Sequence, residues 1–299
     1  MDHNEQMHRF MFDNTDIRGE IVSLDTSFQQ AHKDQHFPNS LTPLFGQFIA
    51  AAALLSEVLK FEGVLTLQAR GEGDVDLIMA EVTDSGSLRG IIHMSEETPE
   101  SPVELPDFTQ LSLPEILVNG LLTITIDPVQ GKRYQGIILV EAATLADCLM
   151  HYFDQSEQIP TYVKLYSDHL FCGGLFLQSL PAQLIKDSEK REELWHTCCH
   201  LAATLKPEEL FTLDNKVVLL RLFHEMQCRT FEPKTVKFEC SCSRNRSANA
   251  IRSLGFQEAQ KVLQERDIIN VDCQLCGTSY AYGESDIVEI FHTEDKPLH

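Results

Sequence analysis

The stretch Phe238-Glu-Cys240-Ser-Cys242, followed after 30 intervening residues by Asp272-Cys273-Gln-Leu-Cys276-Gly277, decides how the C-terminal part of this chain folds. Tetrahedral zinc needs four soft thiolates at ~2.3 Å, and two pairs of cysteines on two turns supply them. A glycine directly after the last ligand lets the backbone turn back toward the sulfurs. The pattern predicts one zinc ion per chain, bound by Cys240, Cys242, Cys273 and Cys276.

Two features of this pattern favour a switch over a purely structural zinc site, which is the simplest alternative. The first pair is Cys-x-Cys, and a disulfide between residues two apart is strained and readily reduced. A module of this size gains only ~3–9 kcal/mol from folding on average scaling, whereas structural zinc supplies ~10–16 kcal/mol. Oxidation that expels the metal should therefore unfold the module. Pairing within each turn gives the disulfides Cys240–Cys242 and Cys273–Cys276.

Outward from this module, the chain divides into three parts. Residues 1–181 combine an Ala-rich helix over Leu44–Phe61 with strand-like hairpins, residues 182–231 are helical in pattern, and residues 232–299 carry the cysteines. Hairpins with separate helices, rather than a regular strand–helix alternation, argue for an α+β fold. We therefore predict an N-terminal mixed helix and antiparallel-hairpin domain, a helical linker and a small C-terminal four-cysteine zinc module.

Three hairpins and one further helix are expected in the N-terminal domain. Turn residues at Asp84-Ser-Gly86 and at Asp127–Gly131 separate runs that are rich in apolar and β-branched residues. The predicted strands are Val64–Arg70, Val75–Val82, Leu88–His93, Leu122–Ile126, Tyr134–Val140, Tyr162–Tyr166 and Leu175–Leu180, and a helix is expected near Thr144–Gln155.

The helical linker carries apolar residues at helical spacing, namely Leu194, Cys198, Leu201 and Leu205. Short amphipathic helices are marginal in water by themselves. We therefore expect these helices to cover an apolar surface of a neighbouring domain.

The formal net charge of −21, from 45 acidic and 24 basic residues, disfavours nucleic acid as a partner. Phosphate contacts need clustered Lys and Arg, and only Arg244, Arg246 and Arg252 come close to such a cluster. The first ten residues lack the cationic and apolar regions of a signal peptide. The longest apolar run, Phe48–Leu55, is short of the ~20 residues that span a membrane. We expect a cytoplasmic protein without a membrane partner.

The sequence resembles the bacterial redox-regulated 33 kDa chaperonins (heat-shock protein 33 family) over essentially its whole length. The most specific element is the pattern Cys-x-Cys-Ser-Arg followed by Cys-x-x-Cys-Gly. In some relatives a further cysteine follows the first pair, where this chain has Ser247. Other matching segments are Arg9-Phe10 with Asn14, Ile17-Arg18-Gly19-Glu20, Leu59-Lys60-Phe61-Glu62-Gly63, Arg133-Tyr134-Gln135-Gly136, Gly173-Gly174 with Leu177-Gln178, Pro181-Ala182-Gln183 and Arg221-Leu222-Phe223-His224-Glu225.

The resemblance implies a chaperone that holds unfolding client proteins without ATP and is not an enzyme. The reduced, zinc-bound protein would be an inactive monomer. Peroxide or hypochlorite, usually with heat, would form the two disulfides and release zinc. The switch module and the linker would then unfold, and the protein would form a homodimer that binds clients. The redox-active cysteines carried over from the family are the zinc ligands Cys240, Cys242, Cys273 and Cys276.

Two alternatives belong to other functional classes. A constitutive zinc-module adaptor that binds nucleic acid or protein would keep its metal and its fold after mild peroxide. A thiol oxidoreductase would need its Cys-x-x-Cys at the start of a helix, but Gly277 breaks any helix after Cys276.

The other cysteines are interpreted without a role in the switch. We expect Cys148, Cys172 and Cys198 to be buried packing residues, and we assign no function to Cys199 at the surface or to Cys228. Arg18 and Glu20 lie close in sequence, and we consider a buried or interfacial pair between them.

Overall fold

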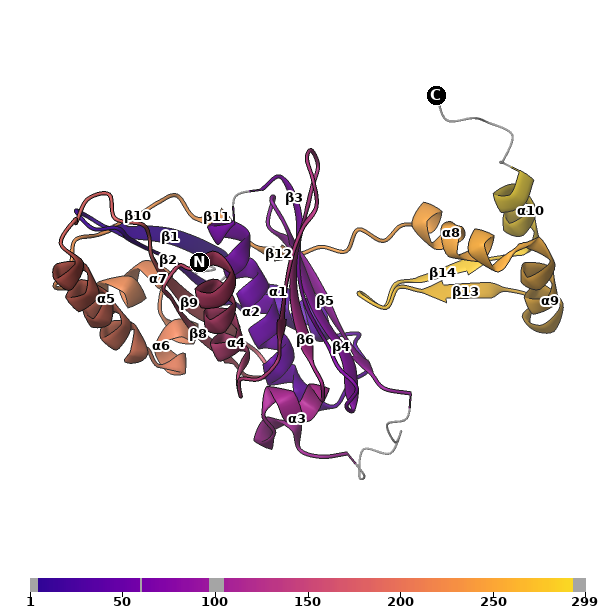
Figure 1. Cartoon of the computed structure of the whole chain (residues 1–299). Coiled ribbons are helices and arrows are strands. Elements are labelled where there is room, and N and C mark those ends of the chain that lie inside the picture. The colour runs from indigo at the N-terminus through magenta and orange to yellow at the C-terminus, as the bar shows by residue number, and fades with distance from the viewer. Residues whose placement is uncertain (1–4, 60, 97–104, 293–299) are drawn as a thin grey trace. The chain divides into compact units, whose positions relative to one another are not determined.

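The computed structural model describes residues 5–59, 61–96 and 105–292, and it separates into two compact units, Met1–Glu239 and Cys240–His299 (Figure 1). Lys60, part of one segment that resembles the family, lies outside the described residues, as do the outer ends of the predicted parts 1–181 and 232–299. Helices combined with antiparallel hairpins confirm the α+β fold class. The three-part division of the chain stays a prediction.

Helix α2, Thr42–Val58, is the centre of unit 1 and packs against strands of two different sheets (Figure 1). Four consecutive alanines in its middle, at positions 50–53, are fully buried. Within the described part of the chain, the stretch Asn39–Val58 is also the one helical stretch long and apolar enough to cross a membrane. Because 78% of its apolar window is buried inside the structure, it is the core helix of unit 1.

Sheet A lies on one side of α2 and is antiparallel throughout. Its main path runs in the order β10-β1-β2-β9-β8, and β11 also pairs with β1. Its strands are β1 (Gln6–Phe12), β2 (Ile17–Leu24), β8 (Thr161–Ser167), β9 (Cys172–Ser179), β10 (Cys228–Thr230) and β11 (Lys234–Thr235).

Sheet A is apolar on both faces. One face packs into the main core with α2, through residues such as Val22 and Phe176. The other face is covered by three short helices, α5 (Ser188–Ala203), α6 (Pro207–Thr212) and α7 (Asn215–Leu222). This confirms that the helices of the linker cover a neighbouring apolar surface. The shared cluster, called here the linker-covered cluster, comprises Phe10, Phe12, Ile17, Ile21, Leu175, Leu177, Cys198, Ala202, Leu205, Leu210, Val218, Leu219, Leu222 and Phe223.

Sheet B also packs against α2 and runs in the order β12-β5-β4-β3-β6-β7. The three predicted hairpins are confirmed as β4–β5 and β6–β7 in this sheet and β8–β9 in sheet A. The strands of sheet B are β3 (Gly63–Arg70), β4 (Val75–Thr83), β5 (Ser87–Met94), β6 (Leu121–Pro128), β7 (Tyr134–Leu139) and β12 (Lys237–Phe238). The remaining helical pieces of unit 1 are α1 (Thr26–His32), η1 (Asn39–Leu41), η2 (Phe108–Gln110), α3 (Leu113–Leu117), α4 (Leu145–Tyr152) and η3 (Phe153–Glu157).

Arg18 and Glu20 do not form the hydrogen-bonded pair that we considered from the sequence. The Arg18 guanidinium donates instead to Gln178 Oε1, at 2.8 and 3.2 Å, and to the carbonyl of Val58 at 3.2 Å. The Glu20 side chain is fully buried, and neither of its oxygens has a hydrogen-bond partner among the described residues. Burial raises the pKa of Glu20 to about 8, although the nearby positive charges of Arg18 and Arg9 lower it.

We expect Glu20→Gln to remove part of the pH dependence of unit 1 stability. The folded pKa of about 8 lies above the ordinary value of 4.5, so the folded state holds one proton more between these values. The contribution of Glu20 to the free energy of unfolding is therefore full below its ordinary pKa. It is lost as the pH rises through the pKa of the folded state. The free energy of unfolding of the wild type minus that of the variant should fall by about 1.4 kcal/mol per pH unit between about pH 5.5 and 7.5.

Chemical denaturation followed by the fluorescence of Trp195, the single tryptophan of the chain, measures this difference. Glu57→Gln is the matched control, because Glu57 is paired with Lys234 Nζ at 2.7 Å. That variant keeps Glu20, so its free energy of unfolding should keep most of the pH dependence of the wild type. A difference between wild type and Glu20→Gln that stays constant over this pH range would mean that Glu20 is ionised in the folded chain.

Candidate metal centre

Unit 2 has a small apolar core. It consists of α8 (Arg244–Leu254), α9 (Phe256–Arg266), the hairpin of β13 (Ile269–Asp272) and β14 (Ser279–Tyr282), and α10 (Glu284–His292). Units of this size are marginally stable, and a further constraint such as a metal often supplements their core. The buried apolar side chains among its described residues are Ala248, Ile251, Ala259, Ile269, Tyr282, Ile287 and Ile290.

The four cysteines identified from the sequence come together in unit 2. Their Sγ atoms all lie within 4.8 Å of one another, at the turn that joins β13 to β14. Cys240 and Cys242 come from the segment before α8, which begins directly after its N-cap Ser243. Close sulfur–sulfur contacts join the two pairs, at 3.6 Å from Cys240 to Cys273 and 3.4 Å from Cys242 to Cys276.

The second pair lies on a tight turn between β13 and β14. The amides of Cys276 and Gly277 donate to the carbonyl of Cys273, at 3.3 and 2.8 Å, and the amide of Cys273 donates to the carbonyl of Thr278 at 2.9 Å. Gly277 has φ +67°, a left-handed conformation that costs glycine little because it has no Cβ. The expected backbone turn after the last cysteine is confirmed.

Two hydroxyl groups on β14 or just before it contact the sulfurs, and the sequence analysis missed both. Tyr280 donates its hydroxyl to Cys242 Sγ at 3.1 Å, and Thr278 Oγ1 lies 3.2 Å from Cys276 Sγ. The hydrogen bond to Cys242, together with burial, raises the pKa of Tyr280 to about 12. The available signal was the polar run Thr278-Ser279-Tyr280, which follows Cys276 and Gly277.

The four thiols differ in their electrostatic surroundings. Burial raises the pKa of Cys240 to about 12, and it also raises the pKa of Cys273. Burial raises the pKa of Cys276 as well, but hydrogen bonds with Thr278 and with the neighbouring thiols outweigh it and lower the value to about 7.

The donor set fits a zinc ion. Four soft sulfur atoms gather without a carboxylate among them, which is the donor chemistry that selects zinc over the hard cations. The hydroxyl contacts of Thr278 and Tyr280 are outer-shell groups of the kind that orient metal ligands. When bound, zinc would join the segment before α8 to the β13–β14 turn.

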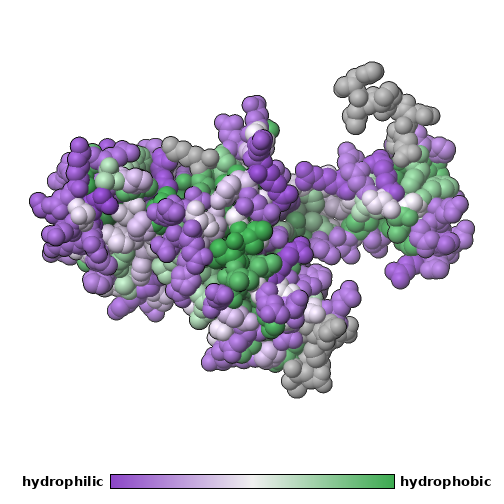
Figure 2. Space-filling view, in the orientation of Figure 1, coloured by the Kyte–Doolittle hydropathy of each residue, from purple (hydrophilic) through white to green (hydrophobic). Residues whose placement is uncertain are grey.

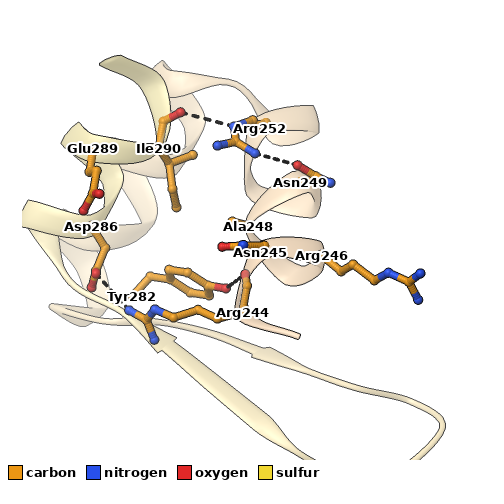
Figure 3. A pocket seen from close by; sticks show the side chains of 10 residues that line it. All are labelled: Arg244, Asn245, Arg246, Ala248, Asn249, Arg252, Tyr282, Asp286, Glu289 and Ile290. Carbon is orange, nitrogen blue, oxygen red and sulfur yellow. Dashed lines mark hydrogen bonds and ion pairs between the residues drawn. The ribbon is translucent and has the colours of Figure 1, made fainter. Parts of the chain in front are cut away.

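Arg244, Arg246 and Arg252, the residues nearest to a basic cluster for binding nucleic acid, make hydrogen bonds and an ion pair within unit 2. Arg244 and Arg252 line a cavity of about 610 Å³ between α8 and α10 (Figure 3). The Arg244 guanidinium pairs with Asp286 at 2.8 Å, and Arg252 Nε donates to the carbonyl of Ile290 at 3.2 Å. Arg246 also lines the cavity, and its guanidinium donates to the carbonyl of Ser241 at 3.0 Å. These internal partners disfavour a phosphate-binding stripe.

The remaining cysteines lie in unit 1. Cys148, Cys172 and Cys198 are buried, as predicted. Cys199, which was expected at the surface, is half-buried, and so is Cys228. Burial raises the pKa of Cys198 to about 12 and that of Cys228 to about 11, which keeps these thiols protonated and unreactive.

The chain was compared with known families, proteins and structures. It matches the model of the family described as "Hsp33 protein" over residues 5–283. The 33 kDa chaperonin of Pseudomonas paraeruginosa is 44% identical over 97% of this chain and 96% of that protein, and the 33 kDa chaperonin of Azotobacter vinelandii is 44% identical over 95% and 93%. The crystal structure of the 33 kDa chaperonin (heat shock protein 33 homolog) of Thermotoga maritima, at 22% identity, has the same fold, with a TM-score of 0.77 over 98% of this chain and 100% of that chain. On the family model and the two relatives, the chain belongs to the Hsp33 family.

Proposed function

We propose that this chain is a redox-regulated chaperone that holds unfolding proteins without ATP. The observation that carries the proposal is the cluster of four sulfurs within 4.8 Å, placed in a unit with a small core. The name chaperonin, carried by the relatives, supports a chaperone that binds client proteins and is not an enzyme. The cysteine cluster supplies the regulation.

In the reduced state, Cys240, Cys242, Cys273 and Cys276 would bind one zinc ion per chain. Each disulfide then forms from two thiolates, two protons and one hydrogen peroxide, and two water molecules are released. We assign the disulfides to Cys240–Cys242 and Cys273–Cys276. Pairing within each turn leaves the two turns free to separate, whereas pairing across them would keep them joined after the metal has left.

Loss of the metal removes the largest stabilising contribution to unit 2. Structural zinc supplies ~10–16 kcal/mol, which is more than the ~3–9 kcal/mol that a domain of this size retains on average. The oxidised unit 2 should therefore unfold. This is the reason for treating the site as a switch rather than as a permanent cross-link.

The chain between the linker helices and the first cysteine is held to unit 1 by short strands. Strands β10, β11 and β12 have three, two and two residues. The last contacts before Cys240 are made by Glu239, whose amide donates to the carbonyl of Leu88 at 3.1 Å and whose carboxylate accepts from Ser87 Oγ at 2.6 Å. Because each attachment is small, unfolding of unit 2 can spread from Cys240 toward α7.

The linker helices themselves are held less firmly than the main core. Helix α5 buries only Cys198 and Ala202 among its residues, and α6 and α7 have six and eight residues. Two polar atoms buried in unit 1, His8 Nδ1 of β1 and Asn215 Oδ1 at the start of α7, have no partner in the described structure. Unpaired buried polar atoms cost free energy, so the cover on sheet A can be released.

Release of the linker helices would expose the sheet side of the linker-covered cluster, including Phe10, Phe12 and Ile21. Exposed apolar patches of this kind bind other proteins. Burial of about 1,000 Å² of apolar surface contributes about 25 kcal/mol before entropy, so a modest patch is enough to hold an unfolded client. With the family, we also propose a cytoplasmic location, a monomer in the reduced state and a homodimer in the oxidised state, without a nucleic-acid or membrane partner.

Light scattering from a client protein unfolded by heat, without ATP, tests the proposed function. The peroxide-treated chain should suppress the scattering, because its apolar surface is exposed, and a dithiol should reverse this effect. The reduced, zinc-loaded chain should not suppress it. Equal suppression by both forms would leave a chaperone without redox control. Zinc and fold retained after peroxide, with no suppression, would favour the adaptor alternative.

Removal of one cysteine tests the metal assignment. Cys273→Ser should lower zinc affinity by more than the roughly 10–100-fold that loss of a group hydrogen-bonded to a ligand costs, and it should loosen unit 2 even in the reduced chain. Zinc content after dialysis and competition with a chromogenic chelator measure the affinity. Cys228→Ser is the matched control, since Cys228 lies in unit 1, and it should keep one zinc per chain. Unchanged affinity in Cys273→Ser would contradict the ligand assignment.

A further inference from the structure

Strand β7 is the open edge of sheet B. It pairs with β6 on one side and is the last strand of the sheet on the other. The amide of Val140 donates to the carbonyl of Gly120 at 2.8 Å, and bonded and non-bonded residues alternate along an antiparallel pair. The N–H and C=O groups of Gln135, Ile137 and Leu139 therefore point outward from the sheet.

The side chains of the same residues make an exposed, partly apolar row. Ile137 and Leu139 are 53% and 60% exposed, and apolar side chains gather where the β6–β7 hairpin runs (Figure 2). The opposite face of β7 packs against α4, so closely that a Cβ at Gly136 would lie 2.5 Å from the Tyr152 ring. Sheet edges are usually protected by proline, lysine or a bulge, and β7 from Tyr134 to Leu139 contains no proline or lysine.

The exposed row on β7 is complementary to the same row of a second chain when the two β7 strands run antiparallel. With a two-fold axis at Ile137, this residue faces its own copy, and Gln135 faces Leu139 of the second copy. Exposed Arg133, just before the strand, then faces exposed Glu141, just after it. In this register the residues with outward backbone groups face one another, so each of these facing pairs can exchange both of its hydrogen bonds. We propose that β7 is the edge through which two copies of this chain join.

The charges at the two ends of the row identify the partner as a second copy. A net charge of −21 keeps copies apart at long range, so contact requires local complementarity. The Arg133–Glu141 pairing occurs twice in a symmetric dimer, once on each side of the axis. An extended client segment can also pair with an open edge, but it carries no fixed charges at these positions.

A single strand pairing is too small to hold the reduced chain as a dimer. Stable interfaces bury roughly 1,200–2,000 Å², which one six-residue strand does not supply by itself. At this point the inference rests on the proposed function: oxidation uncovers further apolar surface on sheet A, and β7 sets the register of the dimer that forms.

A charge exchange on the full-length chain tests the proposal by sedimentation equilibrium after peroxide treatment. Arg133→Glu and Glu141→Arg should each raise the dimer dissociation constant roughly ten-fold, because like charges then face each other twice. The double variant R133E/E141R should restore the wild-type value, which a folding defect would not do. Ile137→Lys should also weaken the dimer, and Lys132→Glu, which changes the same charge outside the register, should not.

Three results would overturn the proposal. The first is an oxidised wild type that stays monomeric, and the second is a dimer whose dissociation constant Arg133→Glu and Ile137→Lys leave unchanged. The third is loss of client holding in Ile137→Lys with an unchanged dimer, which would assign the edge to clients. The scattering assay on the wild type is read separately, so failure of the β7 dimer and failure of the chaperone function are distinguishable.

Discussion

Both faces of sheet A are apolar, so both must be kept away from water. The inner face is covered by α2, one 17-residue helix that is buried along most of its length between two sheets. The outer face is covered by α5, α6 and α7, which have 16, 6 and 8 residues and contribute few buried side chains each. Helices that bury so few side chains depend on the surface they cover, which makes the outer cover the part of unit 1 that is most easily opened.

Unit 2 also contains little buried apolar surface. Its four cysteine sulfurs, by holding a metal, would supply the stability that a large core supplies in unit 1. Its small set of buried apolar residues lies beside a cluster of cysteines within 4.8 Å. A metal there substitutes for buried area, and its removal by oxidation is a change in covalent chemistry rather than in packing. Oxidation of the cysteines can therefore unfold unit 2, because this unit has few other sources of stability.

The last segment of unit 1 leads from the outer helices to the first cysteine, and it pairs with two sheet edges on the way. After α7, the chain covers the edge of β1 with β10 and β11 and the edge of β5 with β12, and the next residue after Glu239 is the first cysteine. Withdrawal of this segment would open two further strand edges together with the outer face of sheet A. Strand β7 differs because it is open in the structure as it stands, with charged residues just beyond each end of its apolar row.

Local signals were sufficient for much of this architecture. Turn residues and alternation predicted three hairpins, the apolar run predicted α2, and helical spacing predicted the linker helices. Cysteine spacing alone brought the four candidate ligands together. Strands β1 and β2 escaped prediction because sheet A is buried on both faces, which removes the alternation that marks a half-buried strand. Strands β10 to β12 have only two or three residues, too few for any periodic signal.

The fold class, the cysteine set and the amphipathic character of the linker were predictable, because each depends on residues close together in the chain. Long-range packing determines that Arg18 bonds to Gln178, that Glu20 has no hydrogen-bond partner among the described residues, and that Tyr280 reaches Cys242. It also decided that β7 is an open edge. These features depend on strand order and register between segments far apart in sequence, which no local pattern encodes.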